Sequence, residues 1–131
     1  MSEIKIKNLE MIQSIISRMA NNSFLLKGWG ITIISGIFSL NHEEMSFAIF
    51  LLIYLIIILF WILDSYYLQL ERRFRVLYDD CVKSEEINFS MKLAEPTDEN
   101  NTTFGQAFLS KTEMGFYLLL AIIISIVFIN I

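Results

Sequence analysis

The sequence of 131 residues has one proline, the residue that most strongly interrupts helices. It has one cysteine and one histidine, two residue types that often serve as nucleophiles, bases or metal ligands. With so little proline and 55% hydrophobic residues, a disordered or collagen-like chain is excluded. The lone Cys81 has no second cysteine with which to form a disulfide inside the chain. There is no nucleophile elbow, phosphate-binding glycine loop, Cys/His metal spacing or arranged carboxylate pair, so we expect no enzyme, metal or cofactor.

Charge is almost missing from three long apolar blocks, at residues 24–40, 46–63 and 114–131. Each block is about long enough to cross a bilayer as a helix, for which ~17 to 25 residues suffice. The first block contains Lys27 and three glycines and could instead be re-entrant or interfacial. Lys27 lies near one end, where its long stem can reach the headgroups. We therefore predict three transmembrane helices.

No ionisable side chain lies in the middle of a predicted span. Proton- and ion-coupled transporters ordinarily need such a group near the midplane, so the sequence argues against a transporter. Asp64 lies at the end of the second block, close to Trp61 and Tyr66. We interpret it as an interfacial residue beside an aromatic belt.

The basic residues predict the orientation. All ten lie either before the core of the first block or between the second and third blocks. The positive-inside rule therefore places the N-terminus and residues 64–112 in the cytoplasm, and the 41–45 turn and the C-terminus outside. A cleavable signal peptide fits poorly, because about 23 mixed residues precede the first block without a small-residue cleavage pattern.

Residues 1–22 predict an amphipathic cytoplasmic helix, with Leu9, Ile12, Ile16 and Met19 at helical spacing. We expect it to pack against the rest of the protein, with binding to the inner membrane surface as the alternative. Asn21, Asn22 and Ser23 then interrupt the pattern and offer an N-cap for the first span. A hairpin of two spans would follow over residues 23–63.

The second helix is predicted to continue beyond the membrane, from about residue 46 to about residue 82. At ~1.5 Å per residue it would be roughly 55 Å long, well beyond a hydrocarbon core of ~30 Å. Its far half carries apolar residues in alternating steps of four and three, which is typical of a heptad seam. Either the N-terminal helix or the same helix of other subunits would cover this seam, which consists of Leu63, Tyr67, Leu70, Phe74, Leu77 and Cys81.

The alternation in INFSMKL, residues 87–93, predicts a short strand, and residues 95–103 read as a loop. A lone strand needs a partner, for which residues 102–104 are the weak candidate within the chain. The expected fold is an all-α membrane protein with three transmembrane helices and this one possible β-strand. The cytoplasmic extension and loop would occupy residues 64–112, and the third span residues 113–131.

Two groups of residues are candidate interaction sites. The first group places small side chains along the first span, where they permit close helix packing: Gly28, Thr32, Ser35, Gly36 and Ser39. Packing inside the chain is the favoured interpretation, and a subunit contact or a pore lining is the alternative. The second group is a basic collar at the membrane surface, Arg72, Arg73 and Arg75. We interpret it as a topology determinant, with lipid or nucleotide phosphates as alternative ligands.

Three segments resemble small, mostly uncharacterised bacterial multi-span membrane proteins: ISRMANNSFLLKGWGIT, FWILDSYYLQLERRFRVLYD and LSKTEMGFY, at residues 16–32, 60–79 and 109–117. The layout is also similar to that of membrane effectors of anti-phage systems, including two-span domains associated with nucleotide second-messenger synthesis. That resemblance implies an oligomer in the bacterial inner membrane. Such an oligomer permeabilises the bilayer when a soluble sensor protein or a nucleotide acts on its cytoplasmic part.

Three functions are therefore expected candidates. The leading one is a homo-oligomeric, channel-like effector in the lipid bilayer, with no nucleic-acid partner. The second is a membrane-anchored adaptor that docks a soluble protein through its cytoplasmic helix and strand. The third is a phage holin-type protein, against which the uncharged external C-terminus and the long cytoplasmic loop argue.

Overall fold

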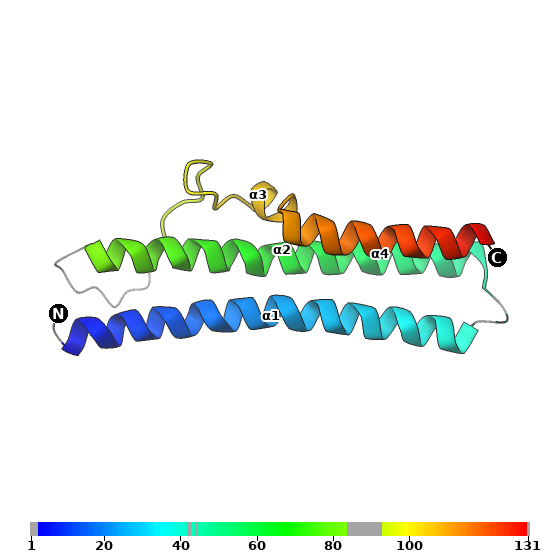
Figure 1. Cartoon of the computed structure of the whole chain (residues 1–131), viewed down its shortest axis with the longest axis horizontal. Helices are drawn as coiled ribbons and strands as arrows, with labels where there is room; N and C mark the ends of the chain where they lie inside the picture. Colours follow the sequence, from blue (N-terminus) through cyan, green and yellow to red (C-terminus); the bar gives the residue numbers. More distant parts are fainter. Residues whose placement is uncertain (1–2, 42, 44, 84–92, 131) are drawn as a thin grey trace.

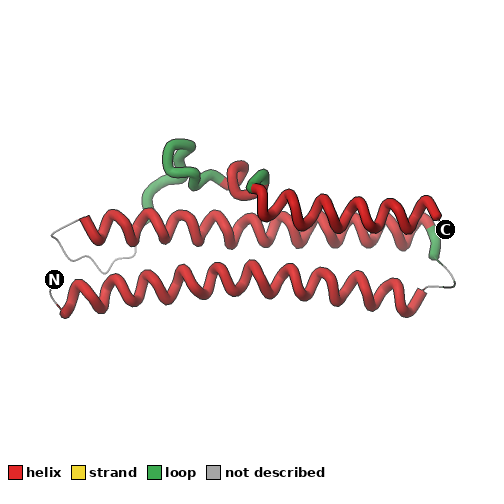
Figure 2. Tube along the Cα trace, in the orientation of Figure 1, coloured by secondary structure: helices red, strands yellow, loops and turns green. Residues whose placement is uncertain are grey.

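The computed structural model describes residues 3–41, 43, 45–83 and 93–130, and all regular structure within these residues is helical (Figure 2). The helices are α1 (Glu3–Asn41), α2 (Phe47–Lys83), α3 (Phe104–Phe108) and α4 (Lys111–Asn130). By length and composition, α1, α2 and α4 can each cross a membrane. The prediction of an all-α chain with three long apolar helices is confirmed, and the three candidate spans suggest a multi-pass membrane protein.

The long helices are arranged around α2 (Figure 1). α1 and α2 form an antiparallel hairpin along their whole length, and α4 runs antiparallel to α2 beside the half that is nearer to the α1–α2 connection. The other half of the hairpin projects beyond α4. We call this projecting part, residues 3–22 of α1 and 66–83 of α2, the extension.

The predicted break between the N-terminal helix and the first span does not occur, because α1 continues through Asn21, Asn22 and Ser23. These residues have modest helix propensity, but none of them stops a helix as proline does. Apart from Asn8, the buried positions of α1 fall on one stripe with steps of three, four or seven residues, as expected of an unbroken helix that packs against α2. The stripe comprises Leu9, Ile12, Ile16, Ser23, Gly30 and Ile34.

The long second helix is confirmed, since α2 begins and ends within one residue of its predicted bounds. Along the predicted seam Leu63 is half exposed, whereas the other five residues are partly buried. At the far end of the seam α1 lies against α2: Asn8 Nδ2 donates to Cys81 Sγ at 3.9 Å, and Lys5 Nζ donates to the carbonyl of Val82 at 3.3 Å. The N-terminal half of α1 is therefore the element beside this part of α2.

The predicted strand falls mainly on residues 87–92, which lie outside the described residues. Its last residue, Leu93, is in no strand, and the proposed partner segment 102–104 is not one either. Instead Thr103 is the N-cap of α3 and forms a capping box with Gln106, each side chain bonding the other's backbone N–H. A capping pair satisfies these N–H groups locally, which favours a helix start over a strand.

The apolar half of the molecule has a small core between α1, α2 and α4. Its buried members are Ile34, Phe50, Ile53, Ile57, Tyr117 and Ile124. Gly30 marks the close approach of α1 to α2, because a Cβ at this position would lie 3.8 Å from the ring of Phe60. Tyr54 donates to Ser125 Oγ at 2.6 Å, while the Ser125 hydroxyl donates to the carbonyl of Ala121, so a polar contact also joins α2 to α4.

We expect Ile12→Ala to lower the free energy of unfolding by about 2 to 4 kcal/mol, because Ile12 is fully buried in the extension and truncation leaves a cavity there. Met11→Ala is the control, since the neighbouring Met11 is 49% exposed. Denaturant titration of both variants in mild detergent, followed by circular dichroism, measures the difference. Equal stability of the two variants would mean that the extension does not pack as described.

Candidate functional site

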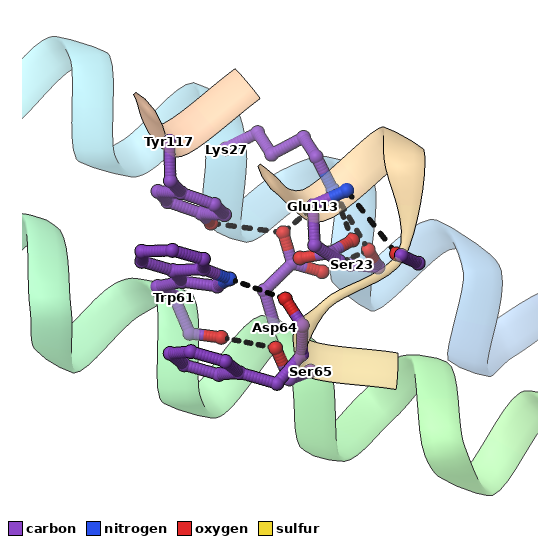
Figure 3. A network of polar contacts seen from close by, with 9 residues as sticks. Ser23, Lys27, Trp61, Asp64, Ser65, Glu113 and Tyr117 are labelled. Atoms are coloured by element: carbon purple, nitrogen blue, oxygen red, sulfur yellow. Dashed lines mark hydrogen bonds and ion pairs between the residues drawn. The ribbon is translucent and has the colours of Figure 1, made fainter. Parts of the chain in front are cut away.

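Five polar side chains from three helices meet where the extension joins the apolar half (Figure 3). They are Ser23 and Lys27 from α1, Asp64 from α2, and Glu113 and Tyr117 from α4. We call them the charge cluster. Ser23 and Lys27 are four residues apart, as are Glu113 and Tyr117, so each helix presents its pair on one face. Both pairs converge on α2, the helix between them.

Asp64 is the centre of the charge cluster and is completely buried. Its Oδ1 accepts a short hydrogen bond from the Ser23 hydroxyl. Its Oδ2 accepts from Lys27 Nζ at 2.6 Å and from the Tyr117 hydroxyl at 2.8 Å. One carboxylate thus receives three donors, from α1 and α4, and charge-assisted bonds of this kind are stronger than neutral ones.

Lys27 joins all three long helices. Besides its bond to Asp64, its ammonium group contacts Glu113 Oε1 at 3.0 Å and Ser23 Oγ at 3.1 Å. It also lies 5.8 Å from the ring centroid of Phe116, within the range of a cation–π contact. The side chain is only 16% exposed. The expected extension of Lys27 to the headgroups is therefore replaced by an ion pair inside the protein.

Glu113 lies in the first turn of α4 and is 1% exposed. Its backbone N–H is bonded to Ser110 Oγ, which caps the start of the helix. A glutamate at this position often bonds back to the capping residue, but here the carboxylate points to Lys27 instead. Its second oxygen, Oε2, is buried without a hydrogen-bond partner among the described residues.

Aromatic rings cover one side of the charge cluster. Trp61 stacks on Phe108 with ring centroids 4.2 Å apart and lies parallel to Tyr117 at 5.9 Å. Its indole N–H donates to the carbonyl of Phe108 at 3.0 Å. α3 and α4 are thereby fixed to α2 at the level of Asp64. The ring stack also keeps water away from the charged groups, which strengthens their interactions.

The charge cluster can hold helices together and can bind a small cationic species. Two carboxylates face one ammonium group, and all three lie in a site that is mostly closed to solvent. Charges so placed near an apolar span are costly unless they are paired, and they often mark functional sites. No three metal-binding side chains are grouped in the ranges that the structure describes.

The small-residue group predicted on the first span lies on the exposed side of α1, where all five of its members are exposed. A Cβ at Gly28 or Gly36 would meet no other atom within 4 Å. Gly28 and Thr32 also line a shallow apolar hollow together with Phe24 and Trp29. The favoured interpretation, packing inside the chain, is therefore wrong for Gly28 and Gly36, and the subunit contact or pore lining stays a prediction.

The arginine collar lies on the extension and holds the segment before α3. Arg72 donates to the carbonyl of Asn101 at 3.4 Å, and Arg73 donates to that of Ala94 at 3.1 Å. Arg75 forms an ion pair at 2.8 Å with Glu71, one turn earlier on α2. Two of the three guanidinium groups are thus engaged with the main chain of this segment.

Sequence reasoning misses the charge cluster because it considers each ionisable residue separately. It assigns Lys27 to the headgroups and Asp64 to an aromatic belt, and it passes over Glu113 at the start of the third span. The sequence does contain one signal, which is that these residues are predicted to lie at a similar depth in the membrane. Lys27, Asp64 and Glu113 each lie at the end of an apolar block that is predicted to face the cytoplasm. Their opposite charges favour pairing.

Comparisons with family models, curated proteins and solved structures found no match for this chain. The expected bacterial family is therefore not identified. The fold and the charge cluster define a coarser class, a small helical protein with three long apolar helices and the composition of a multi-pass membrane protein.

Proposed function

We propose that the chain is a subunit of an oligomeric, channel-like membrane protein that makes the bilayer permeable when its extension is acted on from the cytoplasm. The observation that carries this proposal is the exposed small-residue side of α1. Membrane helices associate where small residues let their backbones approach, because lipid supplies no hydrophobic drive. Gly28 and Gly36 lie there with open space opposite them in the single chain.

The rest of the architecture is consistent with such a subunit. The charge cluster joins α4 to the α1–α2 hairpin, so the apolar half can act as one unit in an assembly. α1 and α2 pass without interruption from the apolar half into the extension, where a partner or ligand would bind. The inner-membrane location, the cytoplasmic N-terminus and a setting in antiviral defence remain predictions from the sequence.

A membrane-anchored adaptor is the second candidate, and exposed apolar residues on the extension favour it. Ile4, Met11 and Val82 are 56%, 49% and 41% exposed although they lie outside the expected membrane region. Exposed apolar side chains outside the membrane often mark a surface that a partner protein covers. In this case the protein would form a stoichiometric complex with a soluble partner and would not make liposomes permeable.

We expect the double variant Gly28→Ile, Gly36→Ile to weaken self-association at least about tenfold, because the added side chains separate the helices. Gly115→Ile is the matched control, since Gly115 is also exposed, on α4, and a Cβ at this position would meet no other atom within 4 Å. Mass photometry of the proteins in mild detergent measures the oligomer. Dye release from liposomes measures the permeability that the oligomer has without its signal, and the double variant alone should lower it.

The result against this proposal is a wild-type protein that is monomeric at every concentration and releases no dye. If the same protein co-purifies with a soluble protein in equal amounts, the adaptor replaces the channel. Unchanged assembly in the double variant, with wild-type oligomers present, would move the subunit contact away from this side of α1.

A further inference from the structure

The charge cluster has an imbalance of charge. If Asp64 and Glu113 are both ionised, two negative charges face the single positive charge of Lys27. Because Lys27 Nζ contacts both carboxylates, at 2.6 and 3.0 Å, the two acidic groups are close neighbours. A net negative charge in a closed site beside an apolar span destabilises the folded protein unless a cation compensates it.

The uncompensated negative charge can be assigned to the carboxylate of Glu113, because its Oε2 receives no hydrogen bond from the described residues. Asp64 accepts bonds from Ser23, Lys27 and Tyr117, so its negative charge is well stabilised. Glu113 Oε1 is bonded to Lys27, but Oε2 is buried and lacks a hydrogen-bond partner among the described residues. A buried carboxylate oxygen that receives no donor calls for an explanation, and a bound proton is one, because the protonated group can donate a hydrogen bond to the neighbouring carboxylate of Asp64.

We propose that Glu113 Oε2 holds an exchangeable proton, so that the charge cluster is a proton-binding site between α4 and the α1–α2 hairpin. The proton comes from solution and adds to the carboxylate, which changes the net charge of the cluster from minus one to zero. No covalent bond of the chain breaks. Lys27 is 16% exposed and gives the cluster an edge that solvent can reach.

The groups that face Glu113 determine the direction of the pH effect. Lys27 from α1 contacts Glu113 directly, Asp64 from α2 shares Lys27 with it, and Ser23 from α1 and Tyr117 from α4 are bonded to Asp64. The docked form binds one proton more than the form in which α4 has separated and Glu113 is hydrated. Linkage then requires that docking of α4 weakens as the pH rises through the range in which the proton leaves.

Infrared spectroscopy of the full chain in lipid nanodiscs tests the proposal, because a protonated carboxyl has its own C=O stretch. We expect this band at neutral pH in the wild type, its loss at alkaline pH, and its absence in Glu113→Gln. The matched control is Glu95→Gln, since Glu95 is an exposed residue of the segment before α3. The midpoint of unfolding in SDS should fall with rising pH in the wild type and stay level in Glu113→Gln.

Absence of the band in the wild type at neutral pH would overturn the proposal. A band that persists in Glu113→Gln but is lost in Asp64→Asn would place the proton on Asp64 and overturn the assignment to Oε2. Carboxylate stretches that shift on exchange of sodium for a bulky organic cation, with no band of a protonated carboxyl, would replace the proton by a metal cation. If Glu113→Gln does not fold, isotope-labelled glutamate in the wild type still separates a glutamate from Asp64, because the label shifts only glutamate bands, and Glu113 is the one glutamate that the structure places in the charge cluster. The proposal does not depend on oligomerisation, so a monomeric protein leaves it intact.

Discussion

Lys27→Met is expected to lower the free energy of unfolding by about 3 to 5 kcal/mol, because it leaves the buried carboxylate of Asp64 without its cation. Asp64 and Glu113 are 0% and 1% exposed, so water does not replace the missing ammonium group. Lys7→Met is the matched control, since Lys7 is an exposed lysine of the same helix. Unfolding in SDS, measured by circular dichroism in nanodiscs or mild detergent, should separate the two variants clearly.

The double variant Lys27→Met, Asp64→Asn gives a further check on this ion pair. Removing both charges should recover part of the lost stability, since the second substitution removes a carboxylate that the first left unpaired. Equal losses in the single Lys27 variant and in the Lys7 control would contradict the arrangement of the charge cluster. A double variant as unstable as the sum of both single variants would show that the two groups act independently.

Trp61→Ala is expected to cost about 3 kcal/mol and to release α3 and the start of α4 from α2. The substitution removes a ring stacked on Phe108 and Tyr117 as well as the hydrogen bond to the Phe108 carbonyl. Trypsin should then cut faster after Lys111, at the first position of α4. The measurements are the SDS midpoint and the rate of appearance of this cleavage product.

The other tryptophan provides the control for this experiment. Trp29 lies on the exposed side of α1 and is 60% exposed, so Trp29→Ala should change the unfolding midpoint and the cleavage rate little. If both tryptophan variants accelerate cleavage after Lys111 equally, the stack at Trp61 does not hold α4 in place. A rate of cleavage after Lys111 in Trp61→Ala that is no higher than in the wild type would lead to the same conclusion.

The three long helices could be predicted from the sequence because their signal is local. An apolar block of sufficient length specifies a span without knowledge of its neighbours. The continuity of α2 was predictable for the same reason, since no residue between Ser46 and Lys83 stops a helix. Local signals failed at Asn21–Ser23, where weak helix formers suggested a boundary although packing against α2 keeps α1 helical.

The charge cluster could not be read from any single segment. Its members lie up to 94 positions apart in the chain, from Ser23 to Tyr117, and nothing local pairs them. Whether Gly28 or Gly30 faces α2 likewise depends on the rotation of α1 about its axis, which the tertiary contacts determine. The structure buries Gly30 and exposes Gly28, so the small residue used inside the chain differs from those that the spacing had suggested.

The unbroken stripe along α1 has a mechanical consequence. Leu9, Ile12 and Ile16 in the extension lie on the same stripe as Ser23, with no hinge between them. A helix turns by about 100° per residue, so a shift of register by one position at the far end would turn this entire face away from α2. Because the helix is continuous, a rotation of α1 about its axis in the extension would also turn Ser23 and Lys27 away from Asp64.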